Sequence, residues 1–259
     1  MTAEREARAR EHDLGAVVGG VTLPFSAMNA AGSVTAMNDV RALAQSRTGA
    51  VVLRTATVHP FVHREFRSLQ NPGFDKLAPL ARELMASGSP PVVASVAGST
   101  IEEFVFLARA FAGAGVAAVE LHLGEPWVEA TLAPCERAAA LEELAARSQE
   151  ASTAPVWIRL PERCALPYRD TVAALVAGGV RAVVVRNEFT GFEKLLLEAG
   201  VPLDVVALGN INSGYDVSRA LAKGAKAVQV GPVLGPAGVG IFGRLEREMR
   251  IARRERPGG

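Results

Sequence analysis

Polar residues that could do chemistry follow a series of short apolar runs along the whole sequence. The runs are typical of buried strands, and the residues at their carboxyl ends are mostly amides, arginines, acids and a histidine. These residues are Asn29, Arg54, Ser95, Glu120, His122, Arg159, Arg186, Asn187, Asn210 and Gly231. If the runs are parallel strands of one barrel, their carboxyl ends meet at one mouth, where barrel enzymes place their active sites.

Three arginines in this set could form an anion site. Arg54, Arg159 and Arg186 would converge from different strands, and guanidinium groups bind phosphate or carboxylate through paired hydrogen bonds. The alternative is a structural ion network, in which some of these arginines pair with acids such as Glu120 or Glu125. We favour the anion site because barrel strands carry functional residues at these ends.

The elements that must position these side chains alternate regularly. Eight apolar runs, each followed by a helical pattern, occupy residues 25–29, 50–54, 91–96, 117–123, 156–160, 181–187, 205–208 and 227–230. This alternation predicts an α/β fold with a parallel sheet, and eight such units predict a TIM (β/α)8 barrel. In the third helical segment, 101–111, apolar residues recur at three- and four-residue steps after a capping signal at Ser99 and Thr100.

A short hairpin is expected before the first strand. Residues 17–23 read as two short strands around Gly19 and Gly20, and such a hairpin could plug the bottom of the barrel. No linker or second domain is indicated. We therefore predict a single domain over residues 1–259, with 1–13 as a flexible or peripheral segment.

Composition narrows the class of protein. The chain has 259 residues, 49% of them hydrophobic, and a formal net charge of +1, which gives no indication of nucleic-acid binding. No apolar run is long enough to span a bilayer, and no signal peptide is visible. Two cysteines, Cys135 and Cys164, imply no disulfide framework. We therefore expect a soluble cytoplasmic protein without membrane partners.

Cys135 itself has two interpretations. It lies near a predicted helix start, which can lower a thiol pKa and make the residue reactive. The favoured interpretation is a small buried residue that fills space in the core.

Several motifs, in order along the chain, resemble those of the dihydroorotate dehydrogenase family of FMN-dependent barrels. They are Asn-Ala-Ala-Gly at 29–32, Arg-Thr-Ala-Thr at 54–57, Leu-Gln-Asn-Pro-Gly-Phe-Asp at 69–75, Ser-Val-Ala-Gly at 95–98, Val-Glu-Leu-His-Leu-Gly-Glu-Pro at 119–126, Arg-Leu-Pro at 159–161, Leu-Gly-Asn-Ile-Asn-Ser-Gly-Tyr-Asp at 208–216, Gln-Val-Gly at 229–231 and Ile-Phe-Gly-Arg-Leu at 241–245. The resemblance implies a TIM barrel, bound FMN, a small anionic substrate and a possible homodimer.

The resemblance also implies which residues line the site. The positions that match the family's FMN site are Ala31, Gly32, Arg54, Thr55, Arg159, Gly209, Asn210 and Gly231. For substrate the candidates are Asn71 and Asn187, which match the family's asparagines, together with Asn29 and Arg186, which end their own apolar runs.

The chain departs from the family mainly at the chemistry. Glu125 stands where the family has a cysteine or serine base, on a loop that is shorter than the family's. His122 and Trp127 replace two substrate-binding asparagines, so we expect either Glu125 or His122 to handle the proton. His122 has a second interpretation, as a hydrogen-bonding wall residue. At the expected phosphate turn, Pro232 has no N–H to donate, so FMN binding is expected to be weakened or lost.

Two functions remain open at this point. The first is an FMN-dependent oxidoreductase that acts on a small anionic substrate, expected to be cyclic but different from orotate. The second is a flavin-free descendant, either an anion-binding protein or a lyase or isomerase that clamps its substrate with arginines. Pro232 and the shortened loop favour the second function. We favour the first because the chain retains the Asn-Ala-Ala-Gly turn, Asn71, Asn187, Gly209 and Gly231. The resemblance then implies pyrimidine metabolism.

A metal site is not expected. His59 and His63, with Glu65, have a spacing that metal sites sometimes use, but Pro60 interrupts any helix that would align both imidazoles.

Overall fold

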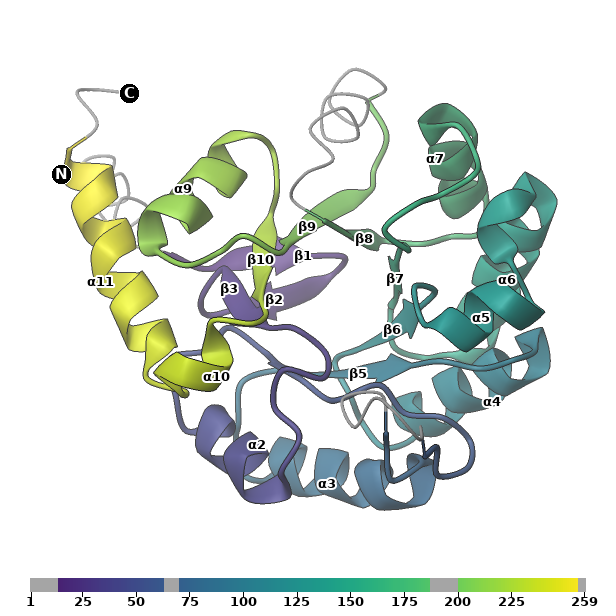
Figure 1. The fold of residues 1–259 in the computed structure, drawn as a ribbon, viewed down its shortest axis with the longest axis horizontal. Helices are drawn as coiled ribbons and strands as arrows, with labels where there is room; N and C mark the ends of the chain where they lie inside the picture. The colour runs from purple at the N-terminus through teal and green to yellow at the C-terminus, as the bar shows by residue number, and fades with distance from the viewer. Residues whose placement is uncertain (1–13, 63–69, 187–199, 256–259) are drawn as a thin grey trace, which may run out of the picture.

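The computed structural model describes residues 14–62, 70–186 and 200–255. Its centre is one sheet of eight parallel strands in the order β3-β10-β9-β8-β7-β6-β5-β4 (Figure 1). The strands are β3 (Ala27–Asn29), β4 (Val51–Val52), β5 (Val92–Val96), β6 (Ala118–His122), β7 (Val156–Arg159), β8 (Ala182–Arg186), β9 (Asp204–Leu208) and β10 (Ala227–Val230). All eight predicted strands are confirmed, most of them one or two residues shorter than expected.

The barrel closes between β3 and β4 through a side chain. Asn29 donates from Nδ2 to the carbonyl of Val52 at 2.7 Å, and its Oδ1 accepts from the N–H of Val52 at 2.8 Å. The N–H of Gly49 adds a bond to the carbonyl of Ala27 at 2.8 Å. A Cβ at Gly49 would lie 1.7 Å from the carbonyl oxygen of Phe25, so the close approach here requires glycine.

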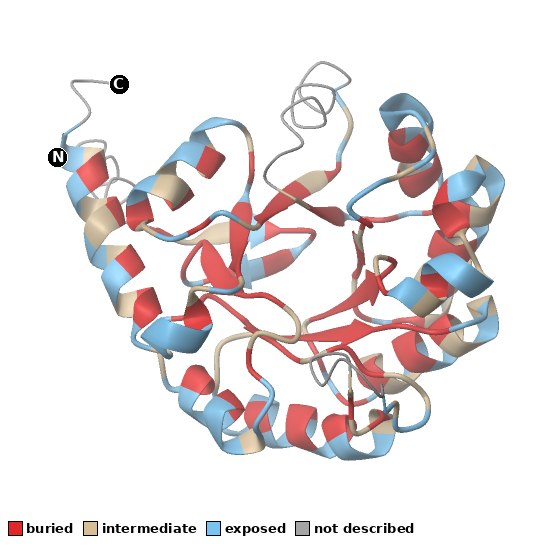
Figure 2. Ribbon diagram, viewed as in Figure 1, coloured by how far each residue is buried: buried red, intermediate tan, exposed pale blue. Residues whose placement is uncertain are grey.

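Helices surround this sheet. They are α2 (Met37–Ala44), α3 (Phe74–Ala86), α4 (Ile101–Ala112), α5 (Pro126–Thr131), α6 (Ala138–Ala151), α7 (Tyr168–Ala177), α9 (Gly214–Ala222), α10 (Leu234–Ala237) and α11 (Ile241–Arg254), with a 3₁₀ turn η2 (Pro134–Glu136). Buried residues occupy the strands and the inward faces of the helices, and exposed residues lie on the outer faces (Figure 2). The helical pattern expected after β8 lies outside the described residues.

The helix predicted over 101–111 is α4. Its apolar positions Phe104, Leu107 and Phe111 are fully buried, as the periodicity predicts. Thr100 caps it by accepting from the N–H of Glu103 at 3.2 Å, which confirms one of the two residues of the capping signal.

The predicted hairpin consists of β1 (Ala16–Val18) and β2 (Val21–Leu23), paired antiparallel. Val18 and Leu23 are buried in one apolar cluster with Trp157 and the inward side chains of several barrel strands. The N–H of Gly19 also donates to the carboxylate of Asp204, the first residue of β9, at 2.8 Å. The hairpin therefore plugs the amino-terminal end of the barrel, as predicted.

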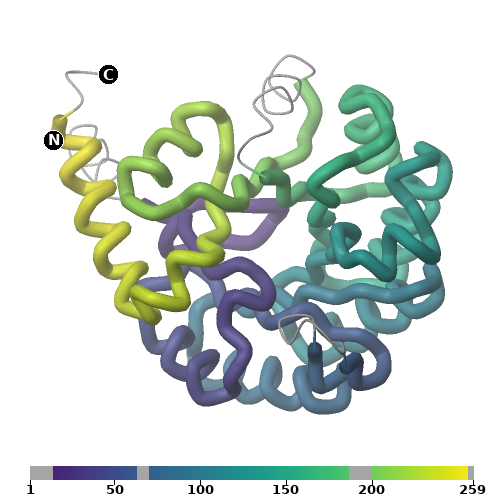
Figure 3. The backbone as a smooth tube through the Cα atoms, in the orientation of Figure 1, coloured from purple at the N-terminus to yellow at the C-terminus, as the bar shows by residue number. Residues whose placement is uncertain are grey.

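In Figure 3 the amino-terminal part of the barrel lies beside its carboxyl-terminal part, where β3 pairs in parallel with β10. One large apolar cluster lies between strands and helices and a smaller one fills the barrel. In the part of the chain that the structure describes, no helix combines the length and the apolar character that crossing a membrane requires.

Candidate functional site

Two adjoining cavities open at the carboxyl ends of the strands. The first, which we call the glycine cavity, has a volume of about 440 Å³ and lies among the turns after β3, β9 and β10. The second, which we call the acid–base cavity, has a volume of about 350 Å³ and lies over the ends of β4, β6 and β7. Ala31, Gly32 and Arg159 line both cavities, so the two are parts of one mouth. Each volume falls in the range of small-molecule sites.

The glycine cavity contains most of the predicted cofactor positions. Gly209, Asn210 and Gly231 line it together with Arg159 and Arg186. Gly209 has a φ of 87°, and a Cβ there would meet no atom within 4 Å. A ligand could therefore approach the backbone closely at this turn, which is what a phosphate cradle requires.

Pro232 also lines the glycine cavity, directly after Gly231. Its backbone nitrogen carries no hydrogen, so the cavity wall lacks an N–H donor at this position, as expected from the sequence.

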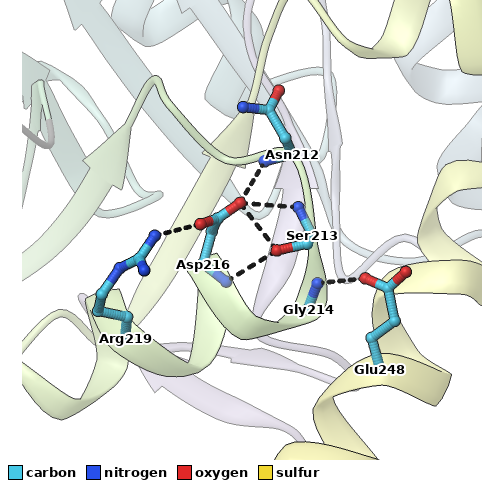
Figure 4. Close-up of polar contacts among 6 residues, drawn as sticks. All are labelled: Asn212, Ser213, Gly214, Asp216, Arg219 and Glu248. Atoms are coloured by element: carbon cyan, nitrogen blue, oxygen red, sulfur yellow. Dashed lines mark hydrogen bonds and ion pairs between the residues drawn. The ribbon is translucent and has the colours of Figure 1, made fainter.

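The turn after β9 is fixed by the start of α9 (Figure 4). Ser213 and Asp216 form a capping box, and the Asp216 carboxylate also accepts from the N–H of Asn212 at 3.0 Å. The N–H of Gly214 donates to Glu248 on α11 at 2.6 Å. These bonds hold the chain that follows Gly209 and Asn210 against the start of α9.

The acid–base cavity contains a contact between the two predicted catalytic residues. His122 Nδ1 lies 2.9 Å from Glu125 Oε1, and both side chains are at least nine-tenths buried. Thr55 Oγ1 lies 3.1 Å from the same nitrogen. Glu125 occupies the cap position before α5, whose first residue is Pro126, so a short helix aims the carboxylate back at the histidine.

Burial and charge set the protonation of this pair. Burial, together with the positive charge of Arg159, lowers the pKa of His122 below its usual value, and Glu125 opposes this only in part. Burial raises the pKa of Glu125, but hydrogen bonds from His122 and Thr55 and the charge of Arg159 outweigh it, so the net direction is downward. At neutral pH the pair is therefore a neutral imidazole beside an ionised carboxylate.

This protonation state has a structural consequence. The ionised Glu125 accepts hydrogen bonds only, so Nδ1 of His122 carries the ring proton and donates it to Glu125. Nε2 is then the nitrogen with a free lone pair, on a ring that lines the cavity. The arrangement can accept a proton from a bound molecule at Nε2.

Arg159 joins the two cavities and rests on a polar layer inside the barrel. Below it, Glu120 accepts from Gln229 Nε2 at 2.6 Å, across the barrel from β6 to β10. Burial lowers the pKa of Arg159, and Glu120 is the first of the charges that oppose this. Among the described residues, Nη1 of Arg159, Oε1 of Glu120 and Oε1 of Gln229 are buried and have no hydrogen-bond partner.

The other two arginines differ in surroundings. Arg54 lines the acid–base cavity, and burial alone lowers its pKa. Arg186 lines the glycine cavity and also forms an ion pair with Glu162. For this arginine the structure therefore supports both interpretations, the anion site and the structural ion network.

The predicted substrate asparagines are not brought together at the mouth. The amide of Asn29 closes the barrel, as described above. Oδ1 of Asn71 accepts from the N–H of Gly73 at 2.9 Å and from Thr57 Oγ1 at 3.0 Å, which holds the loop after β4. Neither asparagine lines a described cavity, and Asn187 lies outside the described residues.

Sequence reasoning missed Gln70, which lines the acid–base cavity. A signal was present, because glutamine stands where the motif of the family has proline. Trp127, which replaces one of the family's substrate-binding asparagines, packs against Phe61, with ring centroids 4.5 Å apart.

Two minor predictions can also be compared with the structure. Cys135 is buried, as the favoured interpretation has it, but the idea that a helix start lowers its pKa is wrong. Contact with Cys164, together with burial, raises that pKa. Within residues 14–62, 70–186 and 200–255, no group of three or more His, Cys, Asp or Glu could hold a metal ion, and His63 and Glu65 lie outside these ranges.

Comparison with known proteins points to one family. No protein-family model matches the chain. The catalytic subunit of dihydroorotate dehydrogenase B (NAD(+)) from Anoxybacillus flavithermus is 29% identical over 201 residues, covering 63% of this chain and 62% of that protein. The putative dihydroorotate dehydrogenase A (fumarate) of Aeropyrum pernix is 28% identical, with the same coverage of 63% and 62%. The chain thus spans less than two thirds of the length of these relatives.

A solved structure supports the fold. The crystal structure of DHODH in complex with ferulenol from Eimeria tenella matches with a TM-score of 0.76, over 92% of this chain and 83% of that chain, at 13% identity. Identity this low shows the fold alone. Together the matches confirm the resemblance: the chain is a TIM barrel whose sequence is similar to dihydroorotate dehydrogenases over about 63% of its length.

Proposed function

We propose that this protein is an FMN-dependent oxidoreductase, similar to dihydroorotate dehydrogenases, with an altered base and an altered substrate pocket. The observation that carries the proposal is the buried contact of His122 with Glu125 at 2.9 Å, in a cavity that adjoins the glycine-lined one. The similarity to dihydroorotate dehydrogenases supports the cofactor.

The residues present fit FMN with one donor fewer than expected. The glycine cavity offers open backbone at Gly209 and positive charge from Arg159 and Arg186, which suits a phosphate. Pro232 removes one N–H, and one charge-assisted hydrogen bond is worth about 1.5–3 kcal/mol, or roughly tenfold to a hundredfold in affinity. We therefore expect FMN to bind more weakly than in a cradle with both donors.

The proposed chemistry divides between cofactor and protein. FMN, when bound, supplies the hydride acceptor. His122 takes the substrate proton at Nε2, and Glu125 holds the ring in the required tautomer and stabilises the imidazolium that forms. The Thr55 hydroxyl also hydrogen-bonds to Glu125 and helps to hold it.

The substrate is proposed to be a small anion, and we expect it to be cyclic. Arg54 and Arg159 line the acid–base cavity and offer two guanidinium groups to a carboxylate, while Gln70 adds an amide. Orotate is disfavoured because the cavity replaces neutral amides by the His122–Glu125 pair. Pyrimidine metabolism is therefore implied only through the relatives.

The visible absorption spectrum of the purified protein, followed by FMN titration of any colourless fraction, tests this proposal. Bound flavin, or FMN binding that quenches flavin fluorescence, is the expected result. Arg159→Gln should weaken FMN binding by about tenfold, whereas Arg181→Gln, at an exposed position outside both cavities, should leave it unchanged. Protein that binds no FMN would overturn the proposal, and equal affinities of the two variants would overturn the role of Arg159.

A second candidate is a flavin-free anion-binding protein, lyase or isomerase. Pro232 favours it, and so does the acid–base cavity, whose His122, Glu125 and two arginines need no cofactor to hold an anion and exchange its proton. Ligand binding or proton exchange that persists in rigorously flavin-free protein would distinguish it from the first.

We further propose a cytoplasmic homodimer. The chain has two cysteines, too few to indicate a disulfide framework, which supports a reducing compartment; the dimer follows from the resemblance. Light scattering of the purified protein would give a dimer mass if the second expectation holds.

A further inference from the structure

The two cysteines of the chain lie together at the edge of the mouth. Cys135 belongs to η2, which follows α5 after strand β6, and Cys164 lies in the loop between β7 and α7. They are 29 positions apart in sequence, yet Cys164 Sγ lies 3.8 Å from the carbonyl oxygen of Cys135. The side chains also contact each other directly, thiol to thiol.

The backbone holds these two loops in place. The N–H of Leu166 donates to the carbonyl of Cys135 at 3.1 Å, so the loop after β7 is tied to η2 on one side of the thiols. On the other side, Cys164 Sγ lies 3.5 Å from Thr171 Oγ1 on α7. Two thiols in contact on tethered loops can be joined by a sulfur–sulfur bond through side-chain rotation, without movement of whole elements.

The two thiols are not equivalent. Cys164 is partly exposed, and hydrogen bonds from Cys135, Thr171 and the N–H of Leu166 outweigh burial and lower its pKa to about 6. Cys135 is 7% exposed, and its contact with Cys164, burial and the charge of Glu129 raise its pKa. The partly exposed Cys164 is therefore the more acidic and more accessible thiol, and the buried Cys135 lies beside it, an arrangement typical of redox-sensitive pairs.

Oxidant can reach Cys164 because this residue is partly exposed, and a cavity adjoins the pair. Cys135 lines a small cavity of about 120 Å³, whose wall also includes Arg163 and Ala165 on either side of Cys164 in the chain. This cavity is separate from the two at the mouth, because none of its lining residues lines either of them.

We propose that Cys164 is an oxidation site that takes a peroxide and that Cys135 resolves it to an intramolecular disulfide. The Cys164 thiolate attacks one oxygen of hydrogen peroxide, forms a sulfenic acid and releases hydroxide, which becomes water. The sulfur of Cys135 then attacks the sulfenic sulfur, loses its proton and displaces a second water. Two thiols are thus oxidised by two electrons while one peroxide is reduced to two waters.

The bond would join the segment after β6 to the segment after β7. Glu125 lies at the start of the segment after β6, and Arg159 is the last residue of β7. The disulfide would therefore connect two segments that adjoin the acid–base cavity. This inference does not depend on FMN or on the proposed reaction.

Thiol titration and intact mass of the full chain, before and after treatment with a slight excess of hydrogen peroxide, test the proposal. We expect titratable thiols under denaturing conditions to fall from two to none, with a mass loss of two hydrogens and no dimer on a non-reducing gel. Reduction with a dithiol should restore both thiols. Retention of both thiols, or oxidation only beyond the sulfenic state, would overturn it.

Single variants assign the two roles. Cys135→Ser should leave a sulfenic acid on Cys164 that a dimedone-type reagent traps, and Cys164→Ser should react at least about tenfold more slowly with peroxide. Thermal melts and circular dichroism check that both variants are folded. Equal peroxide reactivity of the two variants would contradict the assignment of roles. If one variant fails to fold, iodoacetamide labelling of the unmodified protein at pH 7 still ranks the two thiols. Cys164 should then be labelled faster than Cys135.

Discussion

At the scale of single residues, the contact between His122 and Glu125 determines which group can take a proton. Glu125 occupies the position of the base that the family carries, yet its lowered pKa makes it a weak acceptor at neutral pH. His122 is neutral there, and Glu125 directs its lone pair at Nε2. We therefore propose that the role of base moves three residues back along the chain, from Glu125 in the loop to His122 at the end of β6.

The titration of His122 tests this arrangement without knowledge of the substrate. The chain has 4 histidines, so NMR can follow their ring protons separately once variants assign them. We expect His122 to titrate below 6.5, because burial and Arg159 lower its pKa. Glu125→Gln removes a charge that raises this pKa, so the midpoint should move lower still.

A midpoint for His122 above 6.5 would contradict the assignment. Once a substrate is known, His122→Gln should lower kcat by about 10²–10⁴-fold, as general-base variants do. The value of kcat/KM should rise with pH through the His122 pKa and level off at neutrality, because the neutral ring is the active form.

Glu120 is a second residue whose removal should be costly. It is fully buried, bonded to Gln229 and the first of the charges that compensate Arg159. Glu120→Gln should lower the free energy of unfolding by about 1–3 kcal/mol, because a buried guanidinium loses its partner charge. Glu102→Gln, at an exposed ion pair with Arg147, should leave the urea midpoint unchanged. A similar midpoint for both variants would contradict the buried role.

At the scale of elements, α9 and α11 pack so closely that one position admits no side chain. A Cβ at Gly214 would lie 2.5 Å from the carbonyl oxygen of Leu245 and 2.5 Å from the nitrogen of Met249. The bond from Gly214 to Glu248 crosses the same contact (Figure 4). Glycine at this motif position is therefore required by helix packing next to the site.

Alanine substitutions measure that packing. Gly214→Ala should lower the free energy of unfolding by about 1–3 kcal/mol, because the helices must separate. Gly235→Ala in α10, where a Cβ meets nothing within 4 Å, is the matched control and should be neutral. Urea denaturation compares the two, and equal stability would show that the contact at Gly214 is looser than described.

At the scale of the whole molecule, hairpin, barrel and helices are expected to unfold together as one domain. The two tryptophans report on different ends of the barrel. Trp157 is fully buried beside the hairpin, and Trp127 lies on α5 at the mouth. Trp127→Phe and Trp157→Phe each leave one tryptophan as a fluorescence reporter. In each variant, the urea midpoint from tryptophan fluorescence should coincide with the midpoint from circular dichroism. Separate midpoints within one variant would show that the two ends unfold independently.

Much of the fold was predictable because it depends on local pattern. Each strand is a short apolar run, α4 shows its buried face in the spacing of Phe104, Leu107 and Phe111, and Gly19-Gly20 marks the hairpin. Strand ends were less predictable because residues beyond a strand can still be buried and bonded to its neighbour: Leu53, just after β4, is buried and donates to the carbonyl of Val93 at 2.9 Å.

The site was predictable only in part. Motif order identified Gly209, Gly231, Arg54, Arg159, His122 and Glu125, all of which line the mouth. Asn29 and Asn71 have the residue type of a substrate ligand, but Asn29 uses both ends of its amide on Val52, and Asn71 uses its Oδ1 on Thr57 and Gly73. Residue type does not reveal which partner an amide finds in the folded chain.

The sequence by itself determined the barrel, the plug and the set of polar residues at the strand ends, because these follow from local periodicity and from the rule that parallel strands share one carboxyl edge. The tertiary structure alone decided which of those polar groups face a cavity, which pair with each other and which are used inside the fold. It placed His122 against Glu125, Gln229 against Glu120 across the barrel, and Cys164 against Cys135. No local sequence pattern encodes such contacts, because they join positions that are far apart in the chain or on separate turns. Burial at these contacts then sets the charge state of the side chains.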